Sequence, residues 1–156
     1  PNLQRLNVSN ARLTDPILHL LTHSPQLREL VMCRNLEISD MGLSGVVMRC
    51  PNLQCLNIEY CTALTDTSLR RVTAECTQLQ KLSVGGCTVA LSSLMPLTAS
   101  GQFRELWGLF SVIDCQPHVP GEGLTDLVRA LPHLQVFRLS PFRLDAVQLE
   151  ELLDVL

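Results

Sequence analysis

The segment P-N-L-Q-C-L-N-I-E-Y-C-T-A-L-T-D-T-S-L, residues 51–69, contains two periodicities in succession. Its first part places Leu53, Leu56 and Ile58 in an L-x-x-L-x-L spacing, which is typical of a short strand with one buried face. Its second part ends on Leu69, which is followed by apolar or small residues three, four and seven positions later, the stripe of an amphipathic helix. The segment therefore predicts one strand, a turn and one helix.

The same two patterns recur along the whole chain. Successive first positions of the strand pattern are separated by 24, 26, 26, 24 and 31 residues, and each helical stripe leads into the next strand after 9 or 10 residues. A recurring unit of about this length is typical of repeats that stack to bury a continuous core. The strand patterns begin at Leu3, Leu27, Leu53, Leu79, Phe103 and Leu134, and the helical stripes at Leu18, Leu43, Leu69, Leu94, Leu124 and Leu149.

We predict a single α/β solenoid of stacked strand–turn–helix units. The chain has 156 residues, which is enough for one domain of about six repeats. It starts within a strand pattern and stops on a helical leucine, so we expect a fragment of a longer solenoid. The repeats cover approximately residues 1–24, 25–50, 51–76, 77–101, 102–131 and 132–156.

Acidic residues mark the expected helix starts. Asp15, Asp40 and Asp66 each precede a helix's first leucine by three residues and each follow Thr or Ser. We expect their carboxylates to accept hydrogen bonds from the free N–H groups of the first helical turn, worth about 1 kcal/mol each. Asp126 follows Thr125 in the same way but lies too close to the next repeat, so it is interpreted as a solvated helix residue.

The cysteines follow the repeat rather than a metal-binding or disulfide pattern. The chain has seven, and no C-x-x-C occurs. Cys50 and Cys76 are 26 residues apart, as are Cys61 and Cys87, so we expect these four to be reduced and buried at equivalent positions. Reduced cysteines indicate the cytosol or the nucleus.

The composition argues against other classes of partner. The net charge of −3 gives no basis for nucleic-acid binding. No apolar run approaches the roughly 20 residues of a membrane span. Neither a phosphate-binding glycine loop nor a nucleophile motif is present, so we expect no enzyme activity and no cofactor.

The 26-residue unit with a cysteine after the strand and then L-T-D resembles the cysteine-containing leucine-rich repeat. Such repeats are best known from F-box proteins, the substrate receptors of cullin-based ubiquitin ligases. The resemblance covers repeats two to four best; repeat five carries an insertion and repeat six lacks the cysteine. No segment resembles the F-box itself, so the resemblance implies that the ligase adaptor is bound by a region outside this chain.

The resemblance to the leucine-rich repeat implies an arc of parallel strands on the concave face and helices on the convex face. Side chains alternate across a strand, so the positions beside the inward leucines are expected to face outward on the concave side. They form three columns, with one member from each repeat. The first column is Arg5, Glu29, Cys55, Lys81, Glu105 and Val136. The second is Asn7, Val31, Asn57, Ser83, Trp107 and Arg138, and the third is Ser9, Cys33, Glu59, Gly85, a residue near Leu109, and Ser140.

Within these columns, opposite charges fall on adjacent strands, and the chain's single tryptophan takes an outward position. Arg5 beside Glu29 and Lys81 beside Glu105 are positioned to form surface ion pairs. Trp107 at an outward position indicates a partner contact, because tryptophan is enriched among the residues that contribute most to binding. The alternative is that the fifth strand slips in register and buries the ring.

The fifth repeat also carries the insertion, residues 111–121. Long loops on a repeat scaffold often contact partners, and this one lies near Trp107 in sequence. Asp114, Cys115 and His118 suggest a metal site, but these residues do not complete a tetrahedral ligand set.

We therefore expect a protein-interaction module, the substrate-recognition repeats of an F-box-like ubiquitin ligase subunit. The alternative is a scaffold or regulatory binding protein without ligase activity. The partner would occupy the concave face and the loop 111–121. The residues expected to contact it are Trp107, Glu105, Arg138, Lys81, Glu59, Asn57 and His118.

Overall fold

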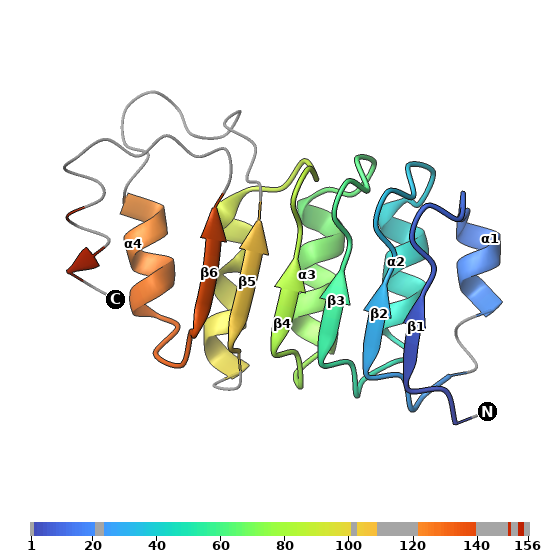
Figure 1. Cartoon of the computed structure of the whole chain (residues 1–156), viewed down its shortest axis with the longest axis horizontal. Coiled ribbons are helices and arrows are strands. Elements are labelled where there is room, and N and C mark those ends of the chain that lie inside the picture. Colours follow the sequence, from blue (N-terminus) through green and yellow to red (C-terminus); the bar gives the residue numbers. More distant parts are fainter. Residues whose placement is uncertain are drawn as a thin grey trace.

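The computed structural model describes residues 2–20, 24–100, 103–108, 122–139, 150 and 153–154. Six short strands form one open parallel sheet in the order β1-β2-β3-β4-β5-β6, so each strand pairs with its neighbours in sequence (Figure 1). One strand falls in each predicted repeat. The strands are β1 (Arg5–Asn7), β2 (Glu29–Val31), β3 (Cys55–Asn57), β4 (Lys81–Ser83), β5 (Glu105–Gly108) and β6 (Val136–Leu139).

Between the strands, the chain forms helices that lie along one side of the sheet (Figure 1). They are α1 (Asp15–Leu18), α2 (Asp40–Val47), α3 (Asp66–Glu75), the 3₁₀ helix η2 (Leu91–Ser100) and α4 (Glu122–Arg129). This is the predicted leucine-rich-repeat solenoid. The fourth repeat differs from the expected α-helix because Pro96 lies inside it and has no N–H to donate to the preceding turn.

The core lies between the sheet and the helices. The central residue of each inner strand is fully buried, as Leu30, Leu56, Leu82 and Leu106 show. The helical leucines close the same core from the other side, so each repeat completes the apolar environment of the next.

Thiols and one amide close the turns after the strands. Cys50, Cys61, Cys76 and Cys87 are free and buried, which confirms their predicted burial in the unpaired state. The Cys61 thiol donates to the Met32 carbonyl at 3.2 Å, and the Cys87 thiol donates to that of Ile58 at 3.1 Å. Each thiol therefore bonds to the backbone of the preceding repeat.

Asn35 fills the position in the second repeat that Cys61 and Cys87 fill in the next two. It is fully buried, and its amide nitrogen donates to the carbonyls of Val8 and Met32 at 3.0 and 2.8 Å. Its carbonyl accepts from the N–H of Leu13 at 3.0 Å. A buried asparagine with both ends satisfied stabilises this turn in the way that the thiols stabilise theirs.

The aspartates at the helix starts do not cap their own helices, and that prediction was wrong. Each is the first helical residue, and the preceding Thr or Ser occupies the N-cap position. The carboxylate instead reaches the next repeat. Asp15 accepts from the N–H and hydroxyl of Ser39 at 2.9 and 2.5 Å, and Asp40 from those of Thr65 at 2.9 and 2.6 Å. Asp66 accepts from the N–H of Ala90 at 2.6 Å.

These aspartate bridges tie consecutive helices together at their amino ends. Ser39 and Thr65 donate hydrogen bonds to these carboxylates. Their hydroxyl oxygens also cap α2 and α3 by accepting from backbone N–H groups two residues on. Partial burial by itself raises the pKa of Asp40, but hydrogen bonds from Thr65 and Ser68 outweigh it and hold the pKa below the usual 3.8. The carboxylate is therefore ionised at neutral pH.

Gly42 makes room for the first bridge. A Cβ at this position would lie 2.1 Å from Oδ1 of Asp15, which is closer than any real contact. Gly45, one turn further along α2, is different: the nearest neighbour of a Cβ there would be a His19 ring carbon at 3.7 Å, an ordinary contact.

No helix among the described residues is long and apolar enough to cross a membrane.

We predict that Gly42→Ala destabilises the protein and that Gly45→Ala stabilises it. Alanine is favoured over glycine inside a helix by about 1 kcal/mol. At Gly45 that gain stands alone, whereas at Gly42 the new methyl group displaces the Asp15 carboxylate and costs about 1–3 kcal/mol in lost hydrogen bonds. Urea denaturation of both variants measures the difference, and equal stability of the two would contradict the bridge.

We also predict that Asp40→Asn lowers the free energy of unfolding by about 1–3 kcal/mol at pH 7, because an amide nitrogen cannot accept the hydrogen bonds of Thr65. The folded pKa is lowered, so the advantage of the carboxylate exists above the unfolded pKa of about 3.8 and is lost as pH falls through the folded value. Unfolding curves from pH 7 to pH 3 should show the wild type and variant converging only below about pH 4.

The control for this experiment is Asp126→Asn in α4, where the carboxylate is exposed, as predicted for a solvated helix residue. It should leave stability within about 0.5 kcal/mol of the wild type at pH 7. A similar loss in both variants would mean that charge, and not the bridge, stabilises the fold.

Candidate functional site: the open face of the sheet

The strand register aligns the predicted columns. In each of the first two columns, every residue is the register partner of the next one along the column. The first column is Arg5, Glu29, Cys55, Lys81, Glu105 and Val136, and the second is Asn7, Val31, Asn57, Ser83, Trp107 and Arg138. In β2, β3 and β4 these positions are exposed or half-buried, whereas the residue between them is buried. The described helices all lie on the other side (Figure 1). We call the surface formed by the first two columns the open face.

One of the two expected ion pairs forms. Lys81 Nζ lies 2.7 Å from Oε1 of Glu105, and this hydrogen bond raises the pKa of Lys81. The pair crosses from β4 to β5 on the open face, where solvent limits its value to about 0–1 kcal/mol. Arg5 and Glu29 are register partners, but among the described residues no ion pair joins them. That part of the prediction was wrong.

The second column contains a fixed polar group at Asn57. Its carbonyl accepts from the Cys33 thiol at 2.9 Å and from the N–H of Glu59 at 3.0 Å. Asn7 makes the equivalent bond in the first repeat, accepting from the N–H of Ser9 at 3.0 Å. These contacts occupy the carbonyl of Asn57 and leave its amide N–H groups as donors toward the open face.

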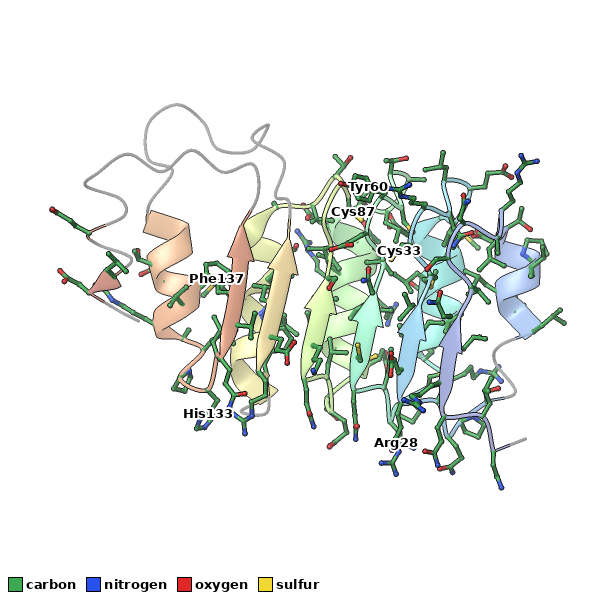
Figure 2. All side chains as sticks on the ribbon, viewed as in Figure 1. Arg28, Cys33, Tyr60, Cys87, His133 and Phe137 are labelled. Atoms are coloured by element: carbon green, nitrogen blue, oxygen red, sulfur yellow. The ribbon has the colours of Figure 1, made fainter. Side chains whose placement is uncertain are left out.

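A left-handed turn residue follows each of the strands β1, β2, β3 and β4. Asn10, Arg34, Tyr60 and Gly86 occupy the same position of successive repeats, with φ of 55°, 58°, 58° and 73°. The Arg34 guanidinium carbon lies 5.4 Å from the centre of the Tyr60 ring, within cation–π range. A Cβ on Gly86 would lie 2.6 Å from that ring. Tyr60 thus stacks between its neighbours at the carboxyl-terminal edge (Figure 2).

Of the remaining predicted contact residues, Trp107 and Arg138 lie on the last two strands of the sheet, β5 and β6. The backbones of Trp107 and Arg138 are register partners, and Trp107 also pairs with Ser83, so β5 keeps the register of the other strands. The side chains of Trp107 and Arg138 lie outside the described part of the chain. So do His118, Asp114 and Cys115, together with the whole insertion 111–121.

Sequence reasoning missed a further row of polar residues. The position before the first column holds Gln or Arg in every repeat, and these residues pair across the sheet at the amino ends of the strands. The signal was in the sequence, because Gln or Arg follows the first apolar residue of each strand pattern. We call this row the Gln/Arg column: Gln4, Arg28, Gln54, Gln80, Arg104 and Gln135.

The Gln/Arg column and the first column together line a groove of about 300 Å³. It crosses the amino ends of β1, β2, β3 and β4, where Figure 2 shows Arg28 at the edge of the sheet. A second hollow, of about 740 Å³, lies on the helix side of the protein and is lined among others by Met41, Met48 and Arg70. It is remote from the columns.

Five of the described thiols have pKa values shifted away from those of a nucleophile: Cys50, Cys55, Cys61, Cys76 and Cys87. Burial raises the pKa of Cys76 and Cys87 to about 12. It also raises the pKa of Cys55, the thiol on the open face, and the nearby Glu29 raises it further. A catalytic cysteine needs the opposite shift. Within the described ranges no group of three His, Cys, Asp or Glu residues could hold a metal ion.

Comparison with known proteins gives one family and two similar folds. The family described as "FBD-associated F-box protein At5g56370, LRR repeats" matches residues 1–89, more than half of the chain. No significant match was found among curated protein sequences.

The two solved structures share the fold at low sequence identity. The tropomodulin C-terminal domain of Caenorhabditis elegans has a TM-score of 0.60 and 16% identity, over 83% of each chain. The structure titled "Leiomodin-1 Actin-Binding Site 2 (ABS2)" has a TM-score of 0.51 and 12% identity, over 99% of this chain and 79% of that one. At these identities the likeness is one of fold alone.

We predict that Trp107→Ala weakens partner binding by about 2 kcal/mol or more, the loss seen at residues that dominate an interface. Its backbone keeps the register of Ser83, the outward position, so folding should be nearly unaffected. If the ring is instead part of the core, the same substitution costs about 3–5 kcal/mol of stability. One urea denaturation curve and one binding titration of this variant decide between the two.

Proposed function

The chain belongs to the leucine-rich-repeat family of the FBD-associated F-box protein At5g56370, and from this membership we propose that it holds a protein substrate for a ubiquitin ligase. The observation that supports a binding role most directly is the open face. It is a continuous sheet surface without a covering helix among the described residues, and polar groups recur on it at the spacing of the strands. A regular polar surface of this kind suits an extended partner.

The open face is firmly held. The aspartate bridges and the buried Asn35 and cysteines connect each repeat to the next through hydrogen bonds. Asn57 and Lys81 are fixed by partners within the face itself. A surface that is ordered before binding loses little conformational entropy when a partner docks, and this favours specific recognition.

The ligase part of the proposal assigns two separate tasks to the protein. The repeats would hold the substrate, and a region outside this chain would bind the ligase adaptor. Ubiquitin transfer would then be performed by other subunits, in agreement with thiols that have raised pKa values on this chain. We place this activity in the cytosol or the nucleus, where unpaired cysteines such as Cys33 and Cys55 stay reduced.

The second candidate is a scaffold or regulatory protein that uses the same face without a ligase. The family match also supports this candidate, because the matched residues 1–89 contain repeats only and a scaffold would use such repeats in the same way. Recovery of the ligase adaptor with the whole protein distinguishes the two candidates.

We expect Ser83→Arg to abolish substrate capture. Ser83 lies at the centre of the open face, half-buried, between Asn57 and Trp107 in the second column. An arginine there would project from the sheet into the partner's position. The measurement is ubiquitylation of co-purified proteins in cells that express the whole protein, either wild-type or variant, together with recovery of the cullin ligase adaptor.

The control is Arg70→Gln on α3, on the helix side of the protein. For a substrate receptor, Ser83→Arg should reduce ubiquitylation at least fivefold while adaptor recovery stays constant, and Arg70→Gln should change neither. Capture of the same partner without adaptor would establish the scaffold instead. Equal capture by wild type and Ser83→Arg would refute the open face as the binding site.

A further inference from the structure

We propose that the groove at the amino ends of β1–β4 binds an acidic peptide segment of the partner, with carboxylates held by Arg5 and Arg28. This inference rests on the proposed binding function and names the chemistry that the partner must bring. The groove is lined by Gln4, Arg5, Arg28, Glu29, Gln54, Cys55, Gln80 and Lys81.

The size of the groove fits a short extended peptide. Its lining residues come in adjacent pairs from four neighbouring strands, so it crosses three strand gaps. At about 4.8 Å per gap this gives about 14 Å, the length of about four extended residues. The volume of about 300 Å³ agrees with a shallow site for a few side chains and excludes a folded element.

The charges of the groove select an anion. Arg5 and Arg28 are exposed, and no described residue pairs with either guanidinium. Lys81 is already neutralised by Glu105 at 2.7 Å, so its charge is not available to a ligand. Glu29 is the one carboxylate among the lining residues, so two unpaired arginines stand against a single negative charge, although the whole chain has a net charge of −3. This edge is therefore locally basic on an acidic protein.

The amides of the groove favour a peptide over a free ion. Gln54 and Gln80 are half-buried, and among the described residues neither side chain has a hydrogen-bond partner. Their backbone carbonyls each accept from two N–H groups of the next repeat, which fixes the backbone from which the side chains extend. A primary amide both donates and accepts, as a peptide backbone does, and arginine forks match carboxylates in geometry.

The test uses four fluorescein-labelled eight-residue peptides and fluorescence anisotropy with the chain at low salt. Their sequences alternate serine with glutamate, with glutamine, with lysine, or with phosphoserine. We expect the glutamate peptide to bind at least tenfold more tightly than the glutamine peptide, and this preference should shrink as salt rises from 20 to 200 mM because the arginines are exposed.

Two arginine variants locate the binding. Arg28→Gln should weaken glutamate-peptide binding about tenfold, whereas Arg70→Gln, an arginine on the helix side, should change it less than twofold. Arg28→Glu should reverse the preference toward the lysine peptide. Circular dichroism checks that each variant is folded, which is expected because Arg28 is exposed.

The outcomes are decisive in both directions. Equal binding of the glutamate and glutamine peptides, or equal losses for Arg28→Gln and Arg70→Gln, overturns the proposal. Binding of the phosphoserine peptide alone also overturns it, because the site would then read phosphate. If substrate capture fails with Ser83→Arg but survives Arg28→Gln, the open face binds a partner and only the assignment of the groove to an acidic peptide is wrong.

Discussion

A single repeat cannot bury its own leucines, so every repeat must match the one before it in position and in hydrogen bonding. The parallel sheet meets this constraint through its backbone, because each strand pairs in register with the next from β1 to β6. The inward leucines Leu30, Leu56 and Leu82 then stack without solvent between them. The residues on either side of these leucines are aligned across the strands in the same way, and the columns that they form make up the open face.

The same constraint acts on the helices, which have no backbone pairing with one another, and on the turns, where side chains add to the backbone hydrogen bonds. There, side chains make the inter-repeat bonds: aspartates at the helix starts, and a buried amide or thiols at the turns. The hydrogen bonds of the aspartates and those of the turn residues differ in chemistry, but both connect one repeat to the next. Gly42 and Gly86 are required where a neighbouring repeat's side chain lies against the backbone, and they leave no space for a Cβ. Stability in this protein is therefore largely a property of the junctions between repeats.

Much of the candidate site follows from alternation alone. Once the leucines face inward, the members of the first two columns are determined, and the structure aligns all of them across six strands. The pairing of Lys81 with Glu105 also follows, since the two residues are neighbours on one face. The Gln/Arg column was missed because it lies before the first outward position, at the ends of the strands, where alternation no longer indicates what a side chain faces. Its place on the groove depends on how four strand ends come together.

The sequence by itself determined the repeat, the order of strand and helix, the inward leucines and the buried cysteines, because each of these is a local period that one chain segment expresses. Only the tertiary structure decided what the polar residues at the helix starts do. From sequence, Asp40 is a cap within its own helix; in the folded protein its carboxylate is bonded to Thr65, a residue 25 positions away. A hydrogen bond goes to the donor that is nearest in space, and the distance between two repeats is set by strand spacing and side-chain packing, which no single segment encodes.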